Sequence, residues 1–115
     1  MEFTNLVDMI TVFANEYCNT GSLVLVVGDA DPLRNIFTFI NSEVVSIDTS
    51  PGHGVDIVVG TILPFENYSF DLIIELKNTY LNFDKFLKPN GKFLKKNVVN
   101  ALENYKLNGE IFSVV

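Results

Sequence analysis

Short apolar runs alternate along the chain with stretches in which apolar residues recur at helical spacing. Residues 5–17 repeat apolar side chains every three or four positions, from Leu6 to Tyr17, and this spacing predicts an amphipathic helix. Residues 23–27 are an unbroken run of leucine and valine, typical of a strand that is buried on both faces of a parallel sheet. The chain therefore begins with a predicted helix followed by a predicted central strand.

The same alternation continues to the end of the chain. An Asp-Pro step at residues 31–32 marks the start of a second helix, because proline is favoured at the first helical position. Strands are expected at 43–47, 56–59, 70–76, 92–94 and 111–115, and helices at 32–39, 79–87 and 98–105. This order predicts one α/β domain over residues 1–115, with a three-layer, Rossmann-like fold and a mostly parallel open sheet of about five to six strands.

One connection does not fit this pattern. A crossover between parallel strands needs about ten to twelve residues or more. Only residues 49–55 separate the second and third apolar runs. We therefore expect the third run either to be antiparallel or to be an edge piece that is loosely attached to the sheet.

Composition excludes some classes of partner. Eight basic and fourteen acidic residues give a formal charge of −6, and they do not supply the clustered Lys and Arg of a nucleic-acid-binding face. The longest apolar run, residues 23–27, is far shorter than the ~20 residues of a membrane span. Cys18 is the single cysteine, so no internal disulfide can form, and we interpret it as a small apolar residue on a helix. These features predict a cytoplasmic protein without a nucleic-acid or membrane partner.

Four segments, in order, resemble motifs of the class I S-adenosylmethionine-dependent methyltransferases. Residues 24–28 (VLVVG) resemble the first strand and the start of the glycine-rich motif, and residues 47–51 (IDTSP) resemble the end of the second strand. Residues 63–65 (LPF) and 69–74 (SFDLII) are similar to the approach to strand four, and residues 87–93 (LKPNGKF) to the turn into strand five. The resemblance implies a Rossmann-like fold with a site for S-adenosylmethionine.

The same resemblance implies four candidate cofactor-binding residues. Gly28 opens the glycine-rich turn, and Asp48 stands where the family has an acid that holds the ribose hydroxyls. Thr61 stands in place of the acid that contacts the adenine region, and Asp29 can bind the ammonium of the cofactor. Two alternatives are structural: Asp48 can cap the turn that follows it, and Asp31 can cap the helix that begins at the Asp-Pro step.

The sequence indicates no catalytic residue and no metal site. His53 lies between two glycines, without the orienting partner of a general base or the further ligands of a metal ion. Asp71 and Glu75 share one face of their strand; we expect Asp71 to pair near the strand start and Glu75 to face solvent at its end. The catalytic residues therefore stay unknown.

The glycine-rich motif departs from the family pattern. Val26, Ala30 and Pro32 stand where the family has an acid and two glycines. Those glycines let the backbone approach the cofactor and donate N–H groups, whereas proline adds a ring and removes a donor. A shortened, motif-poor version of the fold is similar to the N-terminal domain of anamorsin-type proteins, which implies a methyltransferase-like domain that does not act as a methyltransferase.

Two hypotheses follow. The first is a degenerate methyltransferase-like domain that binds S-adenosylmethionine weakly or not at all and serves as a non-catalytic interaction or scaffold module, with a protein partner or a second copy. The second is a minimal S-adenosylmethionine-dependent methyltransferase for a small molecule or protein, with Gly28 and Asp48 holding the cofactor.

Overall fold

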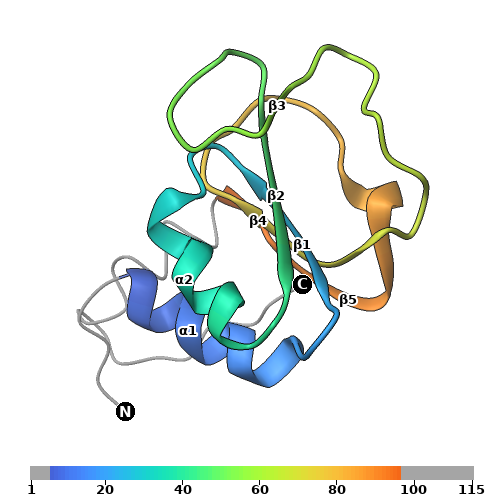
Figure 1. Ribbon diagram of the computed structural model, residues 1–115. Coiled ribbons are helices and arrows are strands. Elements are labelled where there is room, and N and C mark those ends of the chain that lie inside the picture. Colours follow the sequence, from blue (N-terminus) through green and yellow to red (C-terminus); the bar gives the residue numbers. More distant parts are fainter. Residues whose placement is uncertain (1–5, 97–115) are drawn as a thin grey trace.

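The computed structural model describes residues 6–96, which form a parallel sheet with helices on one face (Figure 1). In chain order the elements are α1 (Leu6–Tyr17), β1 (Leu23–Val27), α2 (Asp31–Phe39), β2 (Glu43–Asp48), β3 (Ile57–Val58), β4 (Phe70–Glu75), the 3₁₀-helix η1 (Asp84–Phe86) and β5 (Leu87–Leu94). The sheet has the order β3-β2-β1-β4-β5, and every neighbouring pair is parallel. This order, which runs outward in both directions from β1, confirms the predicted α/β, Rossmann-like class.

Strand β1 is the centre of the molecule. Its residues Val24, Leu25, Val26 and Val27 are all fully buried, as the unbroken apolar run predicts. Successive side chains of a strand point to opposite faces. Val24 and Val26 pack beneath α1 and α2, and Leu25 and Val27 belong to a separate cluster on the other face. Both faces of the sheet are therefore covered.

Loops and η1 cover the second face. The prediction of a helix at 79–87 is wrong, since only η1 is helical there. The side chains of Asn78 and Asn82 accept the backbone N–H groups of Tyr80 and Asp84, at 2.9 and 3.0 Å, and Tyr80 has a positive φ of 61°. Such local side-chain acceptors compete with helical hydrogen bonds. The segment still buries Phe83 and η1 buries Phe86.

The third apolar run forms the edge of the sheet beyond β2. β3 is parallel to β2, so the antiparallel alternative is wrong and the edge alternative is confirmed. Only Ile57 and Val58 pair, opposite Ile47 and Asp48 at the very end of β2. To pair in this way, the chain has to come back along the strand direction by only about two residues, or roughly 7 Å. A loop without a helix can make so short a return.

The remaining strands extend the sheet on the other side of β1. β4 ends at Glu75, close to the prediction, but β5 begins well before residue 92 and includes the predicted turn. Its register shifts there, since Phe70 pairs with Leu87 and Leu72 with Lys92. The predicted helix 98–105 and strand 111–115 lie outside the described residues.

Two further observations concern the described part of the chain. Cys18 is buried, and its burial, together with the nearby charge of Asp71, raises the pKa of the thiol to about 11. The thiol is therefore protonated at neutral pH and is a poor nucleophile. None of the helices within residues 6–96 is both long and apolar enough to cross a membrane.

Candidate functional site

The carboxyl ends of β2, β1 and β4 meet at one edge of the sheet, where open α/β sheets bind their ligands. Asp48 is the last residue of β2, and Gly28 directly follows β1. The structure adds a third residue that the sequence reasoning missed, Lys77, two positions beyond the end of β4. These three residues define what we call the crevice.

A salt bridge spans the crevice. The Lys77 ammonium lies 3.0 Å from each carboxylate oxygen of Asp48, and so joins the strands on either side of β1. The Asp48 side chain is only 11% exposed, whereas that of Lys77 is 51% exposed. The carboxylate of the candidate ribose-binding residue is therefore already occupied by a cation of the same chain.

Gly28 lies against the part of the chain that follows β4. A Cβ atom at this position would lie 3.5 Å from the Cβ atoms of both Leu76 and Lys77. The φ of Gly28 is +115°, a conformation that residues with side chains rarely adopt. Its N–H donates to the Ile47 carbonyl at 2.8 Å. Gly28 thus lets the chain leave β1 sharply, but the backbone that follows β4 and the stem of Lys77 lie over it.

Asp48 also holds the turn that follows β2, as the structural alternative predicts. Its Oδ1 accepts the backbone N–H of Thr49 at 2.6 Å and that of Ser50 at 3.4 Å. Burial by itself would raise the pKa of Asp48, but the hydrogen bonds from Lys77, Thr49 and Ser50 outweigh it and lower the pKa. Asp48 is therefore ionised at neutral pH and supplied with donors.

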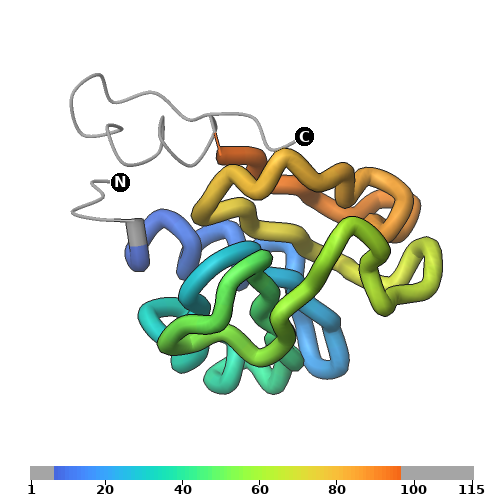
Figure 2. Tube along the Cα trace, turned by 90° about the horizontal axis from the view of Figure 1, so that it is seen from above, coloured from blue at the N-terminus to red at the C-terminus, as the bar shows by residue number. Residues whose placement is uncertain are grey.

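The loop between β2 and β3, residues 49–56, folds down onto the turn between β1 and α2 (Figure 2). The Gly54 carbonyl accepts the N–H of Ala30 at 3.2 Å, the Ser46 hydroxyl at 2.6 Å and Arg34 Nη2 at 3.1 Å. Backbone N–H groups at a helix start are ordinarily available to an anion or a cofactor. Here the N–H of Ala30 is used by the loop.

Arg34 ties the loop to α2 and β2. Its guanidinium bonds Asp31 Oδ1 at 2.9 Å and Asp56 Oδ1 at 3.0 Å. Asp56 Oδ2 also accepts the N–H of Ser46 at 2.9 Å. Burial opposes ionisation of Asp56, but the hydrogen bonds from Ser46 and Arg34 lower its pKa. One arginine thus pairs with two carboxylates and ties the loop to α2.

The acids of the turn have structural contacts that differ from those expected. The carboxylate of Asp29 accepts the N–H of Asp31 at 2.9 Å, so Asp29 rather than Asp31 supplies the side-chain acceptor at the start of α2. Asp31 pairs instead with Arg34 and with His53, whose Nε2 lies 2.6 Å from Asp31 Oδ2. His53 therefore has the partner that the sequence did not reveal, although its side chain is 87% exposed.

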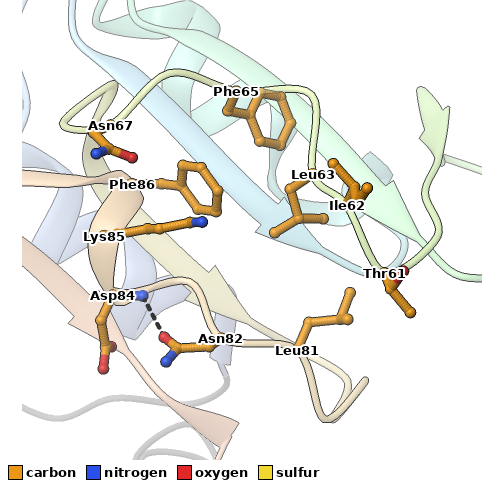
Figure 3. A pocket seen from close by; sticks show the side chains of 10 residues that line it. All are labelled: Thr61, Ile62, Leu63, Phe65, Asn67, Leu81, Asn82, Asp84, Lys85 and Phe86. Carbon is orange, nitrogen blue, oxygen red and sulfur yellow. Dashed lines mark hydrogen bonds between the residues drawn. The ribbon is translucent and has the colours of Figure 1, made fainter.

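Thr61 lies elsewhere, at a groove on the second face of the sheet (Figure 3). This groove, of about 470 Å³, is enclosed by the loop before β4 and the segment that leads into η1. Gly28, Asp29 and Asp48 do not line this groove. The structure therefore brings Gly28 and Asp48 together in the crevice and separates them from Thr61.

The two acids of β4 also have local partners. Asp71 Oδ2 accepts the N–H of Leu23 at 2.9 Å and lies 3.3 Å from the Lys88 ammonium, as expected of a pair near the strand start. Glu75 Oε1 accepts the N–H of Lys96 at 2.8 Å, so it does not simply face solvent. Within residues 6–96, no three side chains of the types that bind metal ions come together.

Comparison with known proteins does not assign the chain to a family. No protein-family model matches the sequence, and no curated protein matches it with significant similarity. The methyltransferase resemblance therefore stays a prediction, and function has to be argued from the contacts described above.

Gly54→Ala tests how firmly the loop is seated. A Cβ atom at Gly54 would collide with the Asp29 carboxylate, and the φ of +72° disfavours any side chain. We expect the variant to lose about 1–3 kcal/mol in free energy of unfolding, measured by urea denaturation. Gly60→Ala is the control, because its Cβ would meet nothing within 4 Å. Equal stability of the two variants would contradict the docking of the loop.

Lys77→Met tests the salt bridge through pH. A lowered pKa means that the Asp48 carboxylate stabilises the fold above its ordinary pKa, and that this stability is lost as the pH falls through the lowered value. Without Lys77, burial should raise the pKa of Asp48 and move acid unfolding to higher pH. Carbon-detected NMR titration of the Asp48 carboxyl group measures this. Lys88→Met, which removes only the bridge to Asp71, should leave the Asp48 titration unchanged.

Proposed function

We propose that this chain is a degenerate, methyltransferase-like domain that serves as a non-catalytic interaction or scaffold module. The observation that carries the proposal is the salt bridge between Lys77 and Asp48, beside Gly28. The resemblance assigns Asp48 to the ribose hydroxyls of S-adenosylmethionine, and this carboxylate is already paired with Lys77. The residues present therefore do not fit the cofactor, and we derive no methyl-transfer step.

The magnitudes favour loss of the cofactor. Displacing Lys77 from Asp48 costs about 1.5 kcal/mol, at the low end for a charged hydrogen bond because Lys77 is half exposed. Freeing the N–H of Ala30 from Gly54 costs about 1 kcal/mol more. Pro32 has no N–H, so one hydrogen bond to a charged group of the cofactor cannot form, which weakens binding by a further 1.5–3 kcal/mol, roughly. A micromolar ligand, bound by about 8 kcal/mol, would then bind with a dissociation constant of about 1 mM or more.

An exposed apolar edge supports the interaction role. β3 is a strand of two residues at the edge of the described sheet, and its Ile57 and Val58 are 37% and 53% exposed. Ile62, a few residues further along, is 87% exposed. A sheet edge offers backbone donors and acceptors to an added strand, and a second copy of the chain or another protein can supply one. We infer that this edge is the partner surface.

Calorimetric titration with S-adenosylhomocysteine tests the loss of the cofactor. We expect no binding heat from the full chain at ligand concentrations up to about 1 mM. The minimal-methyltransferase alternative predicts binding that Asp48→Ala abolishes, provided that the variant keeps the folded circular dichroism spectrum. Binding below about 0.1 mM with that dependence on Asp48 would refute the proposal.

Sedimentation velocity over a range of concentrations tests the edge. We expect the chain either to self-associate, or to be captured in a complex when extracts of its native cells are crosslinked. Val58→Glu should weaken either association at least tenfold, because it places a charge in a desolvated contact. Phe39→Glu is the matched control, because Phe39 is an apolar side chain that is 87% exposed on α2 and is not part of the sheet. A strict monomer that captures no protein, or equal effects of the two variants, would contradict this role.

A further inference from the structure

The groove on the second face has the size of a small-molecule site. Its volume of about 470 Å³ lies within the range of roughly 300–1,000 Å³ that is usual for ligand pockets. Much of its wall is apolar, formed by Ile62, Leu63, Phe65, Leu81 and Phe86. Such a wall accepts an aromatic or branched aliphatic body.

The apolar walls are held in place from below. The Phe65 ring meets the rings of Phe70 and Phe86 edge to face, with centroids 5.0 and 5.9 Å apart. Phe70 and Phe86 are almost fully buried. The Asn82 amide accepts the N–H of Asp84 and fixes the segment opposite. The groove is therefore preformed, which lowers the entropic cost of binding.

One charge projects into this groove. In Figure 3 the Lys85 ammonium lies between the Phe86 ring and Leu63, and the Asp84 carboxylate points away from the groove. The ammonium lies 5.1 Å from the centroid of the Phe86 ring. Within the part of the chain that the structure describes, Lys85 makes no salt bridge. A cation without a carboxylate partner, beside an apolar wall, is complementary to an apolar anion.

We propose that this groove binds a small carboxylic acid with an aromatic or branched apolar body. The body lies against Leu63, Phe65 and Leu81, and the carboxylate pairs with the Lys85 ammonium. The net charge of −6 opposes the approach of an anion, so binding of a carboxylate here depends on the Lys85 ammonium. This proposal does not depend on the state of the crevice.

NMR titration of the full chain with 3-phenylpropanoate, and with its neutral amide as the matched ligand, tests the proposal. We expect a dissociation constant of about 1 mM for the acid, in keeping with its size. The amide should bind about three- to fivefold more weakly, because it lacks the ion pair. The shifted backbone signals should lie in residues 61–67 and 81–86.

Lys85→Met separates charge from shape. The variant keeps an apolar stem but removes the ammonium, so it should bind the acid and the amide equally well. Lys92→Met is the control, since Lys92 also lies over a ring, 5.2 Å from the centroid of Tyr17, but does not line the groove. Equal binding of acid and amide by the natural chain, a preference that survives in Lys85→Met, or signals shifted only outside the groove would each overturn the proposal.

Discussion

The short return of the chain after β2 is the constraint on which the rest of the site depends. A β–α–β crossover would carry the chain away from the end of β1 and leave the turn before α2 open. Residues 49–56 instead double back over the same edge, and their backbone groups need partners there. The Gly54 carbonyl finds them in Ala30, Ser46 and Arg34. The loop that takes the place of a crossover helix is therefore also the segment that covers the turn before α2.

An arginine and a lysine of the same chain pair with three carboxylates at this end of the sheet. Asp31 and Asp56 come from different segments and share Arg34, so their carboxylates would repel one another without it. Lys77 pairs separately with Asp48. The pKa values of Asp48 and Asp56 are lowered as a result. Carboxylates that hold a ligand in an open crevice would have to be free of such partners, so the same residues cannot fill both roles at once.

The features that local sequence determines were predictable. The apolar run of β1 and the Asp-Pro start of α2 lie where they were expected, because burial on both faces and proline at a helix start leave clear local patterns. The segment 79–87 was not, because its apolar residues stand at helical spacing although only η1 is helical there. Asn78 and Asn82, which capture backbone N–H groups there, were the available signal.

The bridge to Asp48 could not be found from local pattern, because Lys77 lies 29 positions away in the sequence. Register would have revealed it: Glu75 pairs with Val27, and Val27 pairs with Ile47. Asp48, at the end of β2, and Lys77, just beyond the end of β4, therefore face each other across the end of β1. That inference needs the strand order first, and strand order comes from tertiary packing rather than from any single segment.

Two connections that lack the expected helix have different effects. The loop 49–56 covers the crevice, and the segment 79–87 leaves the groove on the other face open. A helix at 79–87 would have laid a continuous apolar stripe on the sheet. The segment that replaces it meets the loop before β4 through the rings of Phe65 and Phe86, and through backbone hydrogen bonds from Tyr68 to Lys85 and from Ser69 to Phe86. Space between the loops is then left unfilled, and Lys85 enters it while the Asp84 carboxylate points away. A groove arranged in this way is equipped to recognise shape and charge, but it offers no acid–base pair for chemistry. The loop connections therefore have opposite effects at the two places: they cover the crevice, and they leave the groove open for the ligand that we propose.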